Sequence, residues 1–268
     1  MIPQERKKQI LALLSSHGYM TVEELARRVY VSIPTIRRDL AVLAKEGSVR
    51  RVHGGASHVN QESFEWPFDL RDRVNLPEKR VIGNLAAKLV KDGEHIFIDS
   101  GSTCHFMVEA FAAEIHLTAL SNCIPTIQAL SAFPNITIEC PCGEYVPSHV
   151  SIFGSEAAEF IRTRWAQYYF ASATGMDLKS GVNVRTLMDM PVKKAMRERA
   201  EKMVLLMDHT KMGEANYYTV FGFSEIDILV TDRPLPPEIA DRCAREKIAV
   251  ITPKRCADHS GAERQRSC

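Results

Sequence analysis

The sequence predicts two folds in series: a small winged helix-turn-helix at the N-terminus, then a larger α/β domain with a mostly parallel sheet. Residues 21–56 contain two capped amphipathic helices followed by a basic, glycine-containing hairpin. From residue 76 onward, short apolar runs alternate with helical patterns, which is typical of βαβ units with right-handed crossovers. We expect domains at residues 1–57 and 76–253, a linker at 58–75 and a disordered tail at 254–268.

The composition is that of an ordinary globular protein. The chain has 268 residues, of which 45% are hydrophobic and 25% charged, enough for about two domains. No apolar run is long enough to span a membrane, and no signal-peptide core follows the N-terminus. Seven cysteines without paired metal spacing favour reduced thiols, although Cys140, Cys142 and His149 leave a metal fragment as a minor alternative. We therefore expect a cytoplasmic protein without membrane partners.

The charge is distributed unevenly along the chain. Residues 1–58 contain ten Lys and Arg against five Asp and Glu, whereas the remainder contains 24 against 28. A basic N-terminal domain on a mildly acidic body places the positive field on the helix-turn-helix. A chance fluctuation of a few charges is the alternative, so this asymmetry supports the motif without replacing it.

The helix-turn-helix follows from its capping residues. A first helix is expected at residues 3–17, and a second begins at Thr21, where Glu24 completes a capping box. Ser32 is the next N-cap, and Pro34 is tolerated in the first turn because no intrahelical N–H partner is lost there. The buried face of this third helix is predicted to consist of Ile36, Leu40 and Leu43.

The opposite face of the third helix is small and cationic. A helix in the major groove reads bases with its N-terminal turns, so Thr35 and Arg38 are predicted to meet base edges and Arg37 a phosphate. Gly47 is expected to end the helix, and a two-stranded wing follows. A solvated surface helix is the alternative, but the ordered combination of caps, turn and wing favours DNA binding. The candidate DNA-binding residues are Thr21, Ser32, Thr35, Arg37, Arg38, Arg50, Arg51 and His53.

The α/β domain is predicted from alternating periodicities. Strands are expected at residues 94–98, 117–120, 136–140, 170–173, 203–207, 226–230 and 248–251, and helices at 78–91, 103–113, 125–132, 192–202 and 236–246. In such sheets, ligands bind outside the carboxyl ends of the strands.

Polar clusters follow several of the predicted strands. Residues 99–103 combine hydroxyls, a glycine and a following helix start, a pattern that indicates a phosphate cradle. Asn122, Gly143 and Gly175 stand after later strands, and Lys211 follows another. Each cluster alone is a weak signal, because Ser, Gly and Asn also make caps and turns. The candidate effector-binding residues are Asp99, Ser100, Gly101, Ser102, Thr103, Asn122, Gly143, Gly175 and Lys211.

These motifs resemble those of the DeoR family of bacterial transcriptional regulators. The N-terminal match comprises R-x-x-x-I-L at 6–11, T-V-x-E-L-A at 21–26, S-x-x-T-I-R-R-D-L at 32–40 and R-x-H-G-G-A at 51–56; the C-terminal match includes F-I-D-S-G-S-T at 97–103, G-M-D at 175–177 and D-H-T-K at 208–211. The resemblance implies an effector domain similar in fold to ribose-5-phosphate isomerases and CoA transferases, which binds phosphorylated sugars or related metabolites. Cys104 and Cys142 depart from the family pattern.

The resemblance implies a repressor of a carbohydrate-metabolism operon. Its expected partners are double-stranded operator DNA, a phosphorylated sugar effector and further copies of the chain in a homo-oligomer, and no cofactor or metal is implied. The alternative is an isomerase or CoA-transferase-like enzyme with an accessory DNA-binding domain. Its candidate general bases are Asp99, Glu144, Asp177 and Asp208, and Glu144 is the candidate CoA-transferase nucleophile. A pure sensor would bind its ligand without turnover.

Overall fold

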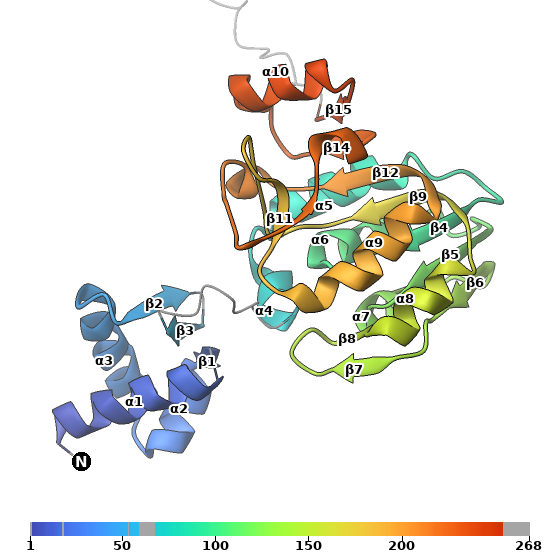
Figure 1. Ribbon diagram of the computed structural model, residues 1–268. Helices are drawn as coiled ribbons and strands as arrows, with labels where there is room; N and C mark the ends of the chain where they lie inside the picture. The colour runs from blue at the N-terminus through green and yellow to red at the C-terminus, as the bar shows by residue number, and fades with distance from the viewer. Residues whose placement is uncertain (1, 18, 53, 59–67, 254–268) are drawn as a thin grey trace, which may run out of the picture.

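The computed structural model describes residues 2–17, 19–52, 54–58 and 68–253, and these residues form the two predicted folds (Figure 1). The predicted tail, residues 59–67 of the predicted linker, and His53 lie outside the described residues. Within them, no helix combines the length and the apolar character that crossing a bilayer requires.

The N-terminal domain is three helices and a three-stranded antiparallel sheet. Its elements are α1 (Pro3–His17), β1 (Tyr19–Thr21), α2 (Val22–Val29), α3 (Ile33–Lys45), β2 (Val49–Val52) and β3 (Gly55–His58). Strand β3 lies between β1 and β2, so the wing has one strand more than expected. The apolar core between the helices and the wing contains Ile10, Leu14, Leu25, Val29, Ile36, Leu40 and Leu43.

Hydrogen bonds confirm the predicted start of α2 and the predicted end of α3, whereas Ser32 precedes α3 without a side-chain cap. The Glu24 amide donates to the Thr21 hydroxyl over 3.0 Å, and the Thr21 amide donates to the Glu24 carboxylate over 2.9 Å, which completes the capping box. At the end of α3, Gly47 has φ +72°, and the Ser48 amide donates to the Leu43 carbonyl over 2.9 Å. This Schellman closure needs a left-handed residue, which glycine supplies without strain.

The C-terminal domain is built on a seven-stranded parallel sheet. The strand order is β15-β14-β12-β9-β4-β5-β6, with a three-stranded antiparallel sheet β10-β11-β13 and a hairpin β7-β8 beside it. The strands are β4 (His95–Ile98), β5 (Leu117–Ser121), β6 (Ile136–Glu139), β7 (Glu144–Val146), β8 (Ser151–Phe153), β9 (Ala166–Ala171), β10 (Gly175–Asp177), β11 (Gly181–Val184), β12 (Ala200–Leu206), β13 (Tyr218–Phe221), β14 (Ile228–Val230) and β15 (Ala249–Ile251). The mostly parallel α/β fold predicted from the sequence is thus confirmed.

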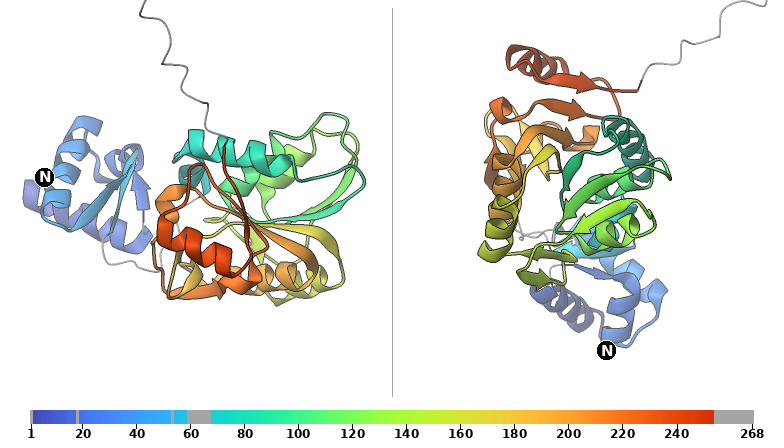
Figure 2. Two further views of the ribbon diagram at one scale, coloured as in Figure 1. Left: turned by 90° about the horizontal axis from the view of Figure 1, so that it is seen from above. Right: turned by 90° about the vertical axis from the view of Figure 1, so that its right-hand side faces the viewer.

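Helices cover both faces of the parallel sheet (Figure 2). Ile96 and Ile98 of β4 join one apolar cluster, whereas Phe97 joins the other, because successive side chains of a strand point to opposite faces. The first cluster includes residues of α5 (Leu76–Ala87), α6 (Ser102–Val108) and α7 (Ile124–Leu130); the second includes residues of α8 (Ser155–Arg162), α9 (Met190–Glu198) and α10 (Pro237–Arg245). Burial on both faces explains the continuous apolar runs of the central strands.

Part of the segment predicted as linker is a helix, which corrects the expectation of an unstructured 58–75. Residues Phe68–Arg73 form α4, and the Phe68 side chain is buried with its ring edge-on to His105 of α6, 5.8 Å between centroids. One turn and a half with a single apolar anchor gives no periodic signal, because a helical period needs several turns to be visible. Helix α6 is also shorter than expected and ends at Val108 instead of residue 113.

Candidate functional site

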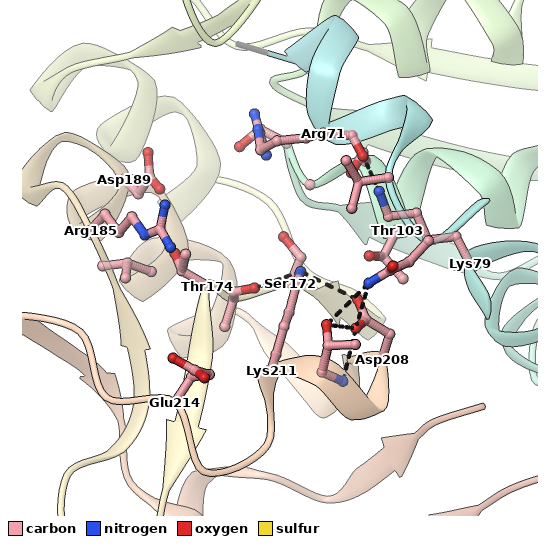
Figure 3. Close-up of a pocket in the computed structure, with 18 of the residues that line it drawn as sticks. Arg71, Lys79, Thr103, Ser172, Thr174, Arg185, Asp189, Asp208, Lys211 and Glu214 are labelled. Atoms are coloured by element: carbon pink, nitrogen blue, oxygen red, sulfur yellow. Dashed lines mark hydrogen bonds and ion pairs between the residues drawn. The ribbon is translucent and has the colours of Figure 1, made fainter. Parts of the chain in front are cut away.

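A cavity of about 530 Å³ lies at the carboxyl ends of the central strands β4, β9 and β12 (Figure 3). Residues after these strands form its floor, the small sheet and the turn after β11 form one wall, and α4 with the start of α5 forms another. Among the described residues, five basic side chains line it, namely Arg71, Lys79, Arg185, Lys193 and Lys211, against three acidic ones, Asp189, Asp208 and Glu214. The excess of positive charge favours an anionic occupant.

The segment after β4 lines the cavity as the cradle predicted from the sequence. Ser100, Gly101, Ser102 and Thr103 all contribute to the wall. A Cβ at Gly101 would lie 1.9 Å from the Ser172 hydroxyl oxygen, so only glycine fits this approach. The buried Thr103 hydroxyl has no hydrogen-bond partner within the described part of the chain. A buried unpaired hydroxyl is costly, and a ligand oxygen would relieve that cost.

Asp99 lies behind the cradle and does not line the cavity. Its carboxylate accepts hydrogen bonds from the Ser100 amide (2.8 Å), the Ser172 amide (2.9 Å) and the Ser172 hydroxyl (2.8 Å), and it ion-pairs with Lys193. Burial raises the pKa of Asp99, but the Lys193 ammonium and the Ser172 donors outweigh it and hold that pKa below its ordinary value. Asp99 therefore positions the cradle and Ser172 and fixes Lys193 in its charged form.

Two lysines and one carboxylate meet on the α5 side of the cavity. Lys79 is buried, its Nζ donates to the Arg71 carbonyl of α4, and burial together with the nearby Lys211 lowers its pKa to about 7. Lys211 donates to the Ala173 carbonyl over 3.0 Å and lies 4.0 Å from an Asp208 carboxylate oxygen. Both ammonium groups thus stand at the wall beside the cradle, where a phosphate would be held by charge and hydrogen bonds.

Three other residues predicted for the effector site lie outside this cavity. The Asn122 side-chain amide donates to the Ile152 carbonyl over 3.0 Å, so it joins the end of β5 to the β7-β8 hairpin. Gly143 is exposed and has φ +144°, in the turn that leads into β7. Gly175 belongs to β10, where a Cβ would lie 2.3 Å from the Glu214 carbonyl oxygen. None of the three is among the lining residues.

Several lining residues were not among the sequence candidates. Arg71 and Asn75 come from the segment predicted as linker, whereas Arg185, Asp189 and Glu214 stand in turns between short strands. No motif marks these positions, because their approach to the cavity depends on tertiary packing. Two other lining residues do belong to sequence motifs: Thr210 is in the D-H-T-K run at 208–211, and Lys193 is in a V-K-K-A-M run at 192–196 that also resembles the family.

The exposed face of α3 carries the residues predicted to meet DNA. Arg37 and Arg38 are exposed, and so is Arg51 on the wing. The Ser32 hydroxyl forms no bond to the α3 backbone and lies 2.9 Å from the Thr35 hydroxyl, whereas the Thr21 hydroxyl is occupied by its cap. Arg50 belongs to β2, and its side chain, like all of His53, lies outside the described atoms.

An ion pair fixes the orientation of α3. Arg6 of α1 makes a two-pronged contact with Asp39 of α3, with Nη2 donating to Oδ1 over 3.1 Å. Both side chains are largely buried, so the pair is shielded from screening salt. The contact holds α1 across α3 while Arg38 remains free to face outward.

One group of side chains in the described residues has the spacing of a metal site. Glu78, His209 and Asp232 each offer a ligand atom within 4.8 Å of the others. Arg233 already supplies a cation there, because it ion-pairs with Glu78 over 3.5 Å and with Asp232 over 3.1 Å. The donor set is therefore satisfied by a guanidinium and does not fit a divalent ion without displacing it.

Comparison with known families and proteins matches both domains. Residues 6–62 match the family model "DeoR-like helix-turn-helix domain", and residues 74–233 match "DeoR C terminal sensor domain". The chain is 32% identical over 235 residues to the HTH-type transcriptional regulator GolR of Listeria innocua, covering 88% of this chain and 92% of that protein. It is 30% identical over 247 residues to the HTH-type transcriptional regulator IolR of Bacillus subtilis, covering 92% and 96% respectively.

Solved structures give a more distant likeness. Ribose 5-phosphate isomerase A from Neisseria gonorrhoeae is 18% identical, with a TM-score of 0.38, over 53% of this chain and 54% of that one. The full-length sorbitol operon regulator SorC from Klebsiella pneumoniae is 10% identical, with a TM-score of 0.35, over 75% and 88%.

Proposed function

Because this chain belongs to the DeoR family of transcriptional regulators, we propose that it represses a carbohydrate-metabolism operon and releases its operator when a phosphorylated sugar or related metabolite occupies the cavity. DNA binding by the winged domain follows from the family. The effector, the residues that touch it and the homo-oligomeric state belong to the proposal. A regulator that acts on the chromosome of a bacterium is expected to work in the cytoplasm.

One observation carries the effector part of the proposal. The unpaired Thr103 hydroxyl and the segment 100–103 stand beside the ammonium groups of Lys79 and Lys211 in one cavity. A phosphate dianion needs several donors and a positive field, and this wall offers both. A phosphate would also favour the charged form of Lys79 and add a second anionic partner for Lys211 beside Asp208, which a neutral sugar cannot do.

We propose that the α/β domain binds without turnover. Three of the four candidate carboxylates have other roles or positions: Asp99 is ion-paired behind the wall, Glu144 is exposed on β7 outside the cavity, and Asp177 accepts hydrogen bonds from the Lys179 and Ser180 amides. Asp208 lines the cavity; its Oδ1 accepts from the Thr210 amide over 3.1 Å, and its Oδ2 lies 4.0 Å from the Lys211 ammonium without a hydrogen bond among the described residues. Lys211 and the Thr210 donors outweigh burial and hold the pKa of Asp208 below its ordinary value, which makes this carboxylate a weak base.

The proposal predicts that Ser102→Asp abolishes the response to effector while operator binding persists. The new carboxylate would stand where a dianion is expected and would oppose it by like charge. A thermal-shift screen of phosphorylated sugars on the full chain identifies a ligand, because a molecule that binds only the native state raises the melting temperature. A gel shift with that ligand then compares release of the wild type with release of the variant.

Two further variants keep this experiment decisive. Ser102→Ala removes one hydrogen bond to a charged group, worth roughly 1.5–3 kcal/mol, and should weaken the ligand without adding charge. Ser155→Asp is the matched control, because Ser155 is exposed at the start of α8, away from the cavity. If the ligand releases Ser102→Asp at the wild-type concentration, the phosphate is held elsewhere and the proposed site is wrong.

A further inference from the structure

The cavity contains a further cationic side chain, Arg185, on the side opposite Lys79 (Figure 3). Arg185 follows β11, whereas Lys79 belongs to α5, and the two side chains lie on opposite sides of the cavity in Figure 3. The cradle and both wall lysines are grouped around the ends of β4, β9 and β12. Arg185 therefore faces a different part of any molecule held by the cradle.

The Arg185 side chain is held in place by a hydrogen-bonded network. Its Nε donates to the Asn216 side-chain oxygen over 3.1 Å. The Asn216 side-chain amide in turn donates to the Asn183 side-chain oxygen over 2.6 Å, and the buried Asn183 donates to the Glu214 carbonyl over 3.1 Å. A guanidinium that is fixed at Nε loses little freedom when its remaining nitrogens bind a ligand.

The two terminal nitrogens of Arg185 have no protein acceptor among the described residues. Asp189 and Glu214 line the same cavity, yet no ion pair joins Arg185 to either. Lys193 and Lys211 differ in this respect, because each has a carboxylate partner within 4.0 Å. Arg185 is thus half-buried and held at Nε, with two terminal nitrogens that can bind a planar carboxylate or a phosphate through two parallel hydrogen bonds, while Asp189 and Glu214 offset part of its charge.

We propose that Arg185 binds a second anionic group of the effector, so that the ligand is a phosphorylated sugar acid or a sugar bisphosphate instead of a simple sugar phosphate. This inference rests on the proposed function, in which the first phosphate occupies the cradle. A cavity of about 530 Å³ is within the usual range for small-molecule sites and has room for a sugar with an anionic group at each end. Asp189 and Glu214 also line the cavity, where carboxylates can accept hydrogen bonds from the hydroxyls between these groups.

The test uses ligands that differ only in the second group. D-gluconate 6-phosphate is compared with D-glucitol 6-phosphate, D-ribonate 5-phosphate with D-ribitol 5-phosphate, and D-fructose 1,6-bisphosphate with D-fructose 6-phosphate. Calorimetric titration of the full chain gives each dissociation constant. At least one doubly anionic probe should bind about tenfold or more tightly than its phosphate-only partner, the worth of a charge-assisted hydrogen-bonded pair. The first two pairs report on a carboxylate and the third on a second phosphate.

Substitutions at Arg185 assign the preference to this residue. Arg185→Gln should bring the affinity of the doubly anionic probe to within about twofold of its partner, while the phosphate-only partner keeps its wild-type affinity. Arg185→Lys keeps the charge but not the planar fork, so it should restore only part of the preference. Arg245→Gln, on the exposed end of α10, is the matched control and should behave as wild type. Melting temperatures of the free variants check that each is folded.

Two kinds of result overturn the inference. If the phosphate-only probes bind as tightly as their partners, or if Arg185→Gln keeps the full preference, Arg185 does not read a second anion, and the proposed phosphate site stands. If no phosphorylated probe binds the wild type at all, the proposed function fails and the inference fails with it.

Discussion

Lys79 is a cavity residue whose side chain changes protonation near neutral pH. Its pKa is lowered from 10.5 to about 7, first by burial and then by the Lys211 ammonium. The unfolded chain therefore binds more protons than the folded one between pH 7 and 10.5, so for this group the free energy of unfolding rises with pH across that window. Below pH 7 the folded protein carries a buried ammonium, which donates a hydrogen bond to the Arg71 carbonyl.

A bound phosphate should return the missing proton to Lys79. The dianion favours the charged lysine, so above pH 7 binding should take up close to one proton and the affinity should fall by up to about tenfold per pH unit. Below about pH 6 the phosphate itself loses charge, which places the tightest binding between roughly pH 6 and 7. Calorimetry in buffers of different ionisation enthalpy measures the proton uptake directly.

The Lys79→Gln variant tests whether Lys79, and not another titrating group, takes up the proton when the ligand binds. It should weaken binding at pH 6.5 and flatten the slope above pH 7, while Lys91→Gln, at an exposed position, should change neither. A variant that keeps the wild-type proton uptake would show that another group titrates, and Lys211 would be the next to examine.

At the scale of elements, the sequence predicts where the helices and strands lie along the chain better than it predicts which elements are neighbours in space. The central strands β4, β5, β9 and β12 are visible as apolar runs because both of their faces are buried. The order of the strands in the sheet cannot be read from the sequence, because β9 and β12 come after β5 and β6 in the chain but lie on the other side of β4. The polar residues after β4 and β12 therefore share a cavity, whereas Asn122 after β5 is bonded to the β7-β8 hairpin.

Short elements explain the remaining gaps in the prediction. β1, β10 and β11 have three or four residues, and α4 has six, too few for a period to emerge from the sequence. They nevertheless bring Arg71 and Arg185 to the cavity. The residues of the cradle were predictable because a local motif contains them, whereas the opposite wall is assembled from distant parts of the chain.

The recognition helix and the wing should respond differently to the loss of one charge. Arg38 is exposed on α3, opposite the buried Ile36 and Leu40, so Arg38→Ala should keep the fold and weaken specific operator binding by about 1–3 kcal/mol. Arg51→Ala on the wing should weaken operator and random DNA alike and reduce the salt dependence. Gel shifts on both DNAs at two salt concentrations compare them. Equal losses of Arg38→Ala on the two DNAs would reassign Arg38 to phosphate.

At the scale of the whole molecule, the chain joins a basic DNA-binding domain to a mildly acidic sensor domain. The excess of five positive charges within residues 1–58 concentrates the attraction for phosphate on the winged domain. The segment that follows the linker, α4, contributes Arg71 to the cavity wall and its carbonyl to Lys79. A ligand in the cavity would therefore lie beside α4, the first described element after the winged domain.

A single winged domain reads only a half-site, so we predict that the protein acts as a homo-oligomer. Two heads held together should bind paired half-sites at least about a hundredfold more tightly than one half-site, because the second contact becomes intramolecular. The sensor domain is the expected interface, and it exposes 49% of Trp165, 57% of Leu187 and 77% of Tyr217, large apolar surfaces that a partner would cover.

Light scattering with matched DNAs tests this prediction. The protein mass, after subtraction of the DNA from the mass of the complex, should be two or more times 30.1 kDa, both free and on DNA with two half-sites. Arg38→Ala serves as the control, because it should lower the affinity for DNA and leave the mass unchanged if the heads do not form the interface. A protein mass of 30.1 kDa when free, one chain per half-site on DNA, and equal affinity for one and two half-sites would show that each chain binds DNA alone. Release by effector would then have to arise within one chain, through α4.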